Sequence, residues 1–194
     1  AKVIGTENGR VLGVSAEGKT SDALAPLVQQ LADKIGKLLA EQASQLVIPP
    51  VPKEDRVAAL KSILGDGARP AISIQVEERH VGQIANDPAA ETELSLIAGE
   101  AGFTVLDKTS IGVKPDVLIT GAGFSEFAMR RGNLACVKAR VEVKVVERGT
   151  GKILATDRQM AVAVDLTEQL AGKAALQEAA AQLAMRVLPK AAGK

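Results

Sequence analysis

The stretch LACVKARVEVKVV, residues 134–146, decides the fold of this chain. Valine occupies positions 141, 143 and 145, and charged residues occupy the positions between them. A strand with this alternation buries one face in a core and leaves the other in water. Strand-like segments also cover 117–129 and 152–164, and only short turns separate the three. The sequence therefore predicts three neighbouring antiparallel strands.

Helices and further strands are predicted on both sides of this meander. Residues 71–76 alternate as a half-buried strand, a helix follows Asp87, and a second short strand precedes the meander. Apolar residues then recur at helical spacing from 166 to 188. The order β, α, β, β, β, β, α predicts an α+β domain at 70–190. We expect a two-layer sandwich in which helices cover one face of a mostly antiparallel sheet and the other face is available for partners.

A glycine turn, a short strand and a helix occur twice, at 8–39 and at 150–183. The second glycines of the two turns, Gly9 and Gly151, lie 151 − 9 = 142 residues apart. A repeat of that size is a domain rather than a solenoid module. Residues 1–47 are therefore predicted to be the closing β-hairpin and helix of a truncated copy of the later domain.

Proline marks the segment between the two domains. The run VIPPVP at 47–52 cannot continue a helix or join the interior of a sheet. Residues 48–69 are therefore predicted to be a Pro-rich linker that carries a short helix from about 53 to 64.

The composition excludes several classes of function. The formal net charge is +1, from 24 basic and 23 acidic residues, and three phenylalanines are the only aromatic residues. The chain therefore has neither the charge nor the stacking platform of a nucleic-acid-binding protein. The sequence contains no run of 18 apolar residues, the pattern that would predict a transmembrane helix. The single cysteine, Cys136, is interpreted as a core thiol and not as a metal ligand.

One motif favours a different function. Residues 13–20 read GVSAEGKT, a full match to the phosphate-binding loop, in which backbone amides surround phosphates. In that interpretation Gly13, Gly18, Lys19 and Thr20 would bind a nucleotide and magnesium. Against it, the strand before the motif is only three residues long, and the rest of the chain lacks alternating β and α elements.

Other candidate catalytic groups are isolated in the sequence. His80 follows a charged run and is interpreted as a solvated strand end. Glu91 and Glu93 lie two residues apart on a helix and so face different directions. The stretch GAGFSE at 121–126 lacks the spacing of a dinucleotide fingerprint or a nucleophile elbow, and its glycines predict a bulge or a close backbone approach. The sequence therefore predicts no catalytic, cofactor-binding or metal-binding residue.

Three segments resemble the curli production assembly/transport component family, the CsgG-like group of bacterial envelope proteins. They are PDVLITGAGFSEF at 115–127, ACVKARVEVKVVERGTGKIL at 135–154 and AETELSLIAGEAGFTVLDK at 90–108. The resemblance covers about 69–188 and implies a CsgG-like α+β domain. It also implies a periplasmic or outer-membrane-associated protein that assembles through protein contacts and performs no chemistry.

The function predicted from the sequence is a non-enzymatic binding or scaffolding module of the cell envelope. Its expected partners are other envelope proteins or further copies of the chain, without a cofactor. Two alternatives stay open: a nucleotide-binding protein that uses the GVSAEGKT loop, and a lipoprotein domain that activates a peptidoglycan synthase.

Overall fold

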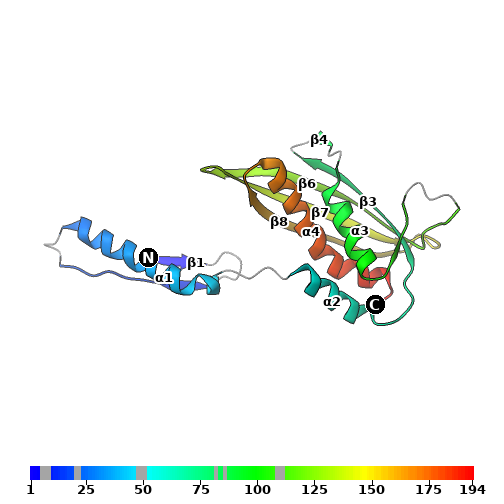
Figure 1. Cartoon of the computed structure of the whole chain (residues 1–194), viewed down its shortest axis with the longest axis horizontal. Coiled ribbons are helices and arrows are strands. Elements are labelled where there is room, and N and C mark those ends of the chain that lie inside the picture. Colours follow the sequence, from blue (N-terminus) through cyan, green and yellow to red (C-terminus); the bar gives the residue numbers. More distant parts are fainter. Residues whose placement is uncertain (5–9, 20–22, 47–51, 81–82, 85–86, 108–111) are drawn as a thin grey trace. The chain divides into compact units, whose positions relative to one another are not determined.

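The computed structural model describes residues 1–194 except 5–9, 20–22, 47–51, 81–82, 85–86 and 108–111 (Figure 1). The chain divides into two compact units, Ala1–Pro52 and Lys53–Lys194. None of the helices in the described ranges combines the length and apolar character needed to cross a bilayer.

The first unit is a hairpin followed by one helix. Strands β1 (Lys2–Ile4) and β2 (Val11–Gly13) pair antiparallel, which confirms the predicted hairpin. Its predicted turn glycine, Gly9, lies outside the described residues. Helix α1 (Leu24–Leu46) follows, and Leu46 is its only buried residue in the described part of the unit.

The second unit contains a sheet in the strand order β4-β3-β6-β7-β8. Its long strands are β6 (Val117–Arg131), β7 (Leu134–Glu147) and β8 (Ile153–Asp165). Both β6 with β7 and β7 with β8 pair antiparallel, so the predicted three-strand meander is confirmed. Strand β8 lies at one edge of this sheet.

The sheet is mixed and, as predicted, most of its strand pairings are antiparallel. Strand β3 (Ala71–His80) pairs parallel with β6 and with the two-residue β5 (Thr104–Val105). The chain passes through a helix between β3 and these strands, and such a crossover returns the chain in the same direction. The two-residue β4 (Gln83–Ile84) pairs antiparallel with β3 and was not predicted.

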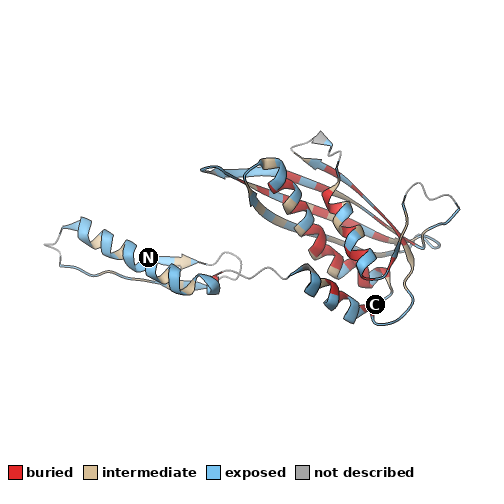
Figure 2. Ribbon diagram, viewed as in Figure 1, coloured by how far each residue is buried: buried red, intermediate tan, exposed pale blue. Residues whose placement is uncertain are grey.

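Helices α3 (Ala89–Glu100) and α4 (Glu168–Ala191) cover one face of the sheet, as predicted (Figure 1). Buried residues gather where these helices meet the strands (Figure 2). The Thr167 hydroxyl accepts the Leu170 amide at 3.2 Å and caps α4. Alanine at 171, 175 and 179 is fully buried, so α4 lies close against the strands.

Helix α2 (Lys53–Leu64), predicted as part of the linker, belongs to the second compact unit. Its residues Leu60 and Leu64 are buried in the same core as α4. Arg56 also donates two hydrogen bonds to the Glu178 carboxylate on α4, at 3.0 and 2.8 Å. The apolar contacts and this bidentate ion pair fix α2 to the domain.

The predicted close backbone approach at GAGFSE is confirmed. A Cβ built on Gly121 would lie 2.2 Å from the backbone oxygen of Glu142 on β7. Only glycine leaves room for that carbonyl. The irregularity in the β6–β7 register lies further along, between Phe127 and Met129.

Candidate binding surface

Within the second unit, none of the described helices covers the face of the sheet opposite α3 and α4. On β7 the odd-numbered residues from 135 to 145 are buried, and the even-numbered residues between them are exposed or half-buried. The strand register continues this alternation onto β3, β6 and β8. We call the side that bears the even-numbered β7 residues the open face. It is the wet face that the valine alternation predicted.

One end of the open face carries exposed apolar side chains. They are 45–64% exposed, and the register places them on β6, β7 and β8 near the β6–β7 turn. We call this set the apolar patch: Phe124, Met129, Leu134, Met160, Val162 and Val164. Isolated exposed apolar residues are common, but several on one sheet face mark an interaction surface.

Paired charges cross the same end of the face. Lys138 Nζ lies 2.8 Å from Glu126 Oε1, and Arg140 pairs with Glu142. These opposite charges largely neutralise each other beside the patch. An apolar surface with balanced charges suits a protein partner.

Cys136 lies on the open face, which corrects its interpretation as a core thiol. It is half-buried, and the register places it between Met129 on β6 and Val164 on β8. The core positions of β7 are the odd-numbered ones, so an even-numbered cysteine faces away from the helices.

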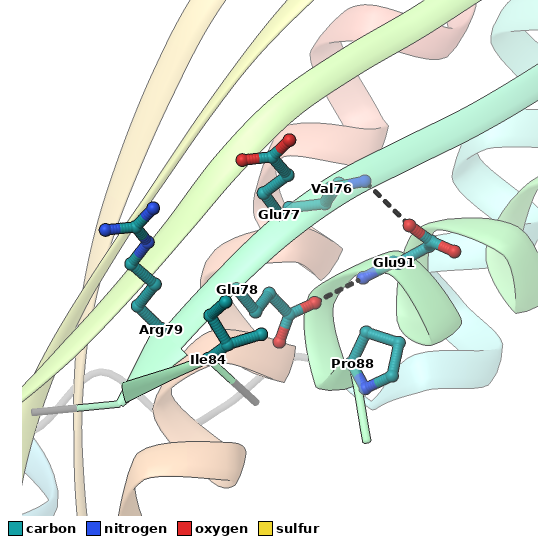
Figure 3. Close-up of a pocket in the computed structure, with 7 residues that line it drawn as sticks. All are labelled: Val76, Glu77, Glu78, Arg79, Ile84, Pro88 and Glu91. Atoms are coloured by element: carbon teal, nitrogen blue, oxygen red, sulfur yellow. Dashed lines mark hydrogen bonds between the residues drawn. The ribbon is translucent and has the colours of Figure 1, made fainter. Parts of the chain in front are cut away.

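A recess of about 370 Å³ lies at the β3 edge, between β3, β4 and the start of α3 (Figure 3). Glu78 extends from β3 beneath it and is only 4% exposed. Its carboxylate accepts the backbone amides of Ala89, Ala90 and Glu91 at 2.7–2.9 Å. This carboxylate caps α3, whose preceding residue Pro88 provides no side-chain cap.

Burial raises the pKa of the Glu78 carboxyl above its ordinary value of 4.5, against the lowering effect of the three amides. The neighbouring Glu91 carboxylate adds to the rise. Glu91 itself accepts the Val76 amide at 2.7 Å, which closes part of the β3 edge (Figure 3). Both carboxylates are therefore occupied by backbone donors, and their arrangement supports a structural role.

His80 is bonded to neighbouring side chains, which corrects its interpretation as a solvated side chain. Its Nδ1 lies 2.8 Å from Ser125 Oγ, and its Nε2 lies 3.8 Å from Glu168 Oε1. These residue types match a hydrolase triad. However, Ser125 is only 3% exposed, and Gly172 of α4 lies against both the serine and the histidine. A substrate would have to displace α4, so the cluster supports a polar junction between the sheet and this helix.

The GVSAEGKT segment begins in the hairpin of the first unit. Gly13 pairs with Lys2 in antiparallel β2, and the Val14 amide donates to the Ala1 carbonyl at 3.0 Å. The Ser15 carbonyl accepts from Lys34 Nζ at 2.7 Å. A phosphate loop normally leaves a buried parallel strand, so this setting does not support nucleotide binding. Thr20 lies outside the described residues. No group of three or more potential metal ligands occurs among the described side chains.

Comparison with known proteins identifies solved structures of remote similarity. No family model and no curated protein sequence matches the chain. A protein from Xanthomonas campestris of the DUF330 family aligns over 62% of this chain and 83% of its own, with 10% identity and a TM-score of 0.41. A minor lipoprotein from Acinetobacter baumannii aligns over 59% and 91%, with 14% identity and a TM-score of 0.39. The PelC dodecamer from Paraburkholderia phytofirmans aligns over 63% and 88%, with 14% identity and a TM-score of 0.38.

These findings correct the predicted membership of the CsgG-like family. No model of that family matches the chain, and no curated protein of that family matches it either. The segments that suggested the resemblance consist of apolar positions and turn glycines. Any strand meander packed on helices needs residues of these types, so the pattern indicates the α+β class and does not identify one family.

Proposed function

We propose that this chain is a non-enzymatic binding module whose open face receives a protein partner. The apolar patch is the observation that carries the proposal, because its six side chains are 45–64% exposed on one side of one sheet. The helices stabilise the opposite side, so a partner could cover the open face without disturbing the core.

The patch is large enough to contribute substantially to binding. Full burial of an aliphatic or aromatic side chain yields about 1.5 to 3 kcal/mol. Roughly half of each patch side chain is exposed, so covering it would gain about 1 kcal/mol per residue. The six residues together would then contribute roughly 6 kcal/mol, before the entropic cost of association.

The non-enzymatic part of the proposal is supported by the groups that resemble catalytic residues. Ser125 is buried beneath α4, and the carboxylates of the β3 recess accept backbone amides. We propose the bacterial cell envelope as the location, and cell fractionation tests it. The argument from the open face does not depend on that location.

Capture of partners from envelope extracts of the source cells tests the surface. The variant Phe124→Lys places a charge in the apolar patch, and Gln75→Lys places the same charge on β3, at the other end of the open face. We expect Phe124→Lys to lose the partners that the unchanged chain captures and Gln75→Lys to retain them. Identical partners for Phe124→Lys and the unchanged chain would refute the proposal.

Activation of a peptidoglycan synthase is one form that such binding could take. The open face supplies the docking surface that this alternative requires. A purified synthase whose rate rises with the unchanged chain and with Gln75→Lys, but not with Phe124→Lys, would favour it.

We also propose that the first unit repeats the closing part of the second. Ile4 pairs with Val11, and adding 142 to both numbers gives Val146 and Ile153, which pair in the second unit. The match of this one pair at the 142-residue offset supports the repeat. The other two pairs of the hairpin differ by one residue, because the β7–β8 register shifts between Val145 and Val146.

A further inference from the structure

The two edges of the sheet differ in how their backbone groups are satisfied. At the β3 edge, β4 covers one end of the strand and β5 covers the other. Between them, Glu91 Oε2 accepts the Val76 amide at 2.7 Å. Natural proteins close sheet edges in this way to prevent another strand from pairing with them.

Side chains close the first half of the opposite edge, on β8. The Arg158 amide donates to Asp157 Oδ1 at 2.7 Å, and the Arg158 carbonyl accepts from Arg186 at 3.3 Å. The Met160 carbonyl accepts from the Gln159 amide group at 3.0 Å. These bonds to side chains indicate that the backbone groups at 158 and 160 point away from β7.

The second half of β8 is an open edge. Every second residue of an antiparallel strand bonds the same neighbour, so the backbone of Val162 and Val164 also points outward. The β7–β8 register is regular from Thr156 to Asp165, so no bulge reverses this direction. Among the described residues, no side chain forms a hydrogen bond with the backbone amide or carbonyl of Val162 or Val164, in contrast to residues 158 and 160.

The sequence of this open edge is symmetric about Val162. Residues 159–165 read QMAVAVD. The central Val162 has an alanine on each side, a larger apolar residue beyond each alanine (Met160 and Val164), and a polar residue at each end (Gln159 and Asp165). Reversing the direction of the strand preserves this order of residue types. An isologous dimer, in which the same surface of both copies meets about a twofold axis, needs such a self-complementary edge.

Charge favours a pairing centred on Val162 over one centred on Ala161. Centred on Val162, the pairing sets Met160 opposite Val164 of a second copy and leaves no like charges opposite each other. Centred on Ala161, it would set Asp157 opposite Asp165, and like charges directly opposite destabilise a sheet. The pairing centred on Val162 also leaves the hydrogen bonds of Arg158 undisturbed.

We infer that β8 is a dimer interface, in which residues 159–165 of two chains pair antiparallel about a twofold axis at Val162. The two sheets become one continuous sheet. The alanines at 161 and 163 lie on the helix side, where small side chains leave room for the two α4 helices. On the open face, the pairing joins the apolar patches of both copies, so the inference rests on the proposed function and names a second copy as one partner.

Sedimentation velocity on the full chain tests the dimer. We expect a mass of 2 × 20.1 = 40.2 kDa for the unchanged chain. Val162→Pro should halve that mass, because proline removes an outward amide that β7 does not use. Thr156→Pro, the matched control on the same edge but outside the pairing, should remain dimeric. Far-UV circular dichroism confirms that both variants are folded. A monomeric unchanged chain, or a dimeric and folded Val162→Pro variant, would overturn the inference.

Cysteine pairing tests the register in a Cys136→Ser background. Centred on Val162, Ala161→Cys of one copy lies opposite Ala163→Cys of the other, within reach of a disulfide. A mixture of the two variants should therefore cross-link on oxidation, and neither variant alone should. Cross-linking of Ala161→Cys alone would indicate the register centred on Ala161 and refute the one inferred.

The two proposals fail separately. A chain that sediments as a monomer but loses its captured partners with Phe124→Lys refutes the dimer and supports the binding surface. A chain that dimerises as expected, but captures the same partners with and without Phe124→Lys, supports the dimer and refutes the open face as the site of other partners.

Discussion

Adding one methyl group at Gly121 should destabilise the second unit more than the same change two residues later. The Cβ of Gly121→Ala would lie 2.2 Å from the Glu142 carbonyl oxygen and 2.9 Å from Val143 Cγ1. Relief of the first contact requires the backbones of β6 and β7 to separate, which breaks ladder hydrogen bonds. We expect a loss of about 3 kcal/mol, the upper end of the usual overpacking cost. For a domain of this size, that loss corresponds to roughly 6 to 12 °C in melting temperature.

Gly123→Ala is the matched control because it adds the same atom to the same strand and face. Its Cβ would lie 3.1 Å from Glu78 Cγ and 3.1 Å from Leu176 Cδ2, and both side chains can shift. We expect a loss of about 1 kcal/mol. The chain contains neither tryptophan nor tyrosine, so far-UV circular dichroism in urea is the suitable measurement. A Gly121→Ala variant no less stable than Gly123→Ala would refute the reasoning from the backbone contact.

Two further predictions concern charged groups of the second unit. Because burial raises the folded-state pKa of Glu78 above 4.5, its stabilising contribution is complete below pH 4.5 and is lost as the pH rises through the folded-state pKa. Between pH 4.5 and neutral pH, the urea midpoint of the unchanged chain and of the control Glu77→Gln should therefore fall as the pH rises. The midpoint of Glu78→Gln should lack this fall. An equal fall in all three proteins would contradict the attribution of the pH dependence to Glu78. Arg56→Ala should cost about 1 kcal/mol by removing both bonds to the partly exposed Glu178, and Arg56→Lys should cost less because it keeps the charge. An unchanged midpoint for Arg56→Ala would show that apolar contacts alone hold α2.

The meander and the helix layer could be predicted because their signals are local. Alternation on β7 indicates its two faces, and apolar residues at helical spacing predict α4. The parallel pairing of β3 with β6 could not be predicted in this way, because it depends on which strands meet after a helical crossover. For the same reason α2 looked like part of a linker: the ion-pair partner of its Arg56, Glu178, lies 122 residues away in sequence.

Parts of the candidate surface were predictable and parts were not. The valine alternation indicates a wet face, but the apolar patch forms only when the register brings Phe124 beside β7 and Met160 beyond it. The capping role of Glu78 leaves only a weak signal in the sequence. Glu78 precedes helix α3, and Pro88, the residue before that helix, has no side-chain group that could cap it. The partners of His80 arise from β6 and α4, so no local pattern in the sequence contains them.

The position of Cys136 provides a built-in optical probe. It is the chain's sole thiol, half-buried between Met129 and Val164, and tryptophan and tyrosine contribute no background. A small environment-sensitive dye attached to its sulfur would shift its emission when another molecule settles on that side of the sheet. Titrations can therefore follow association in real time without introducing any new residue.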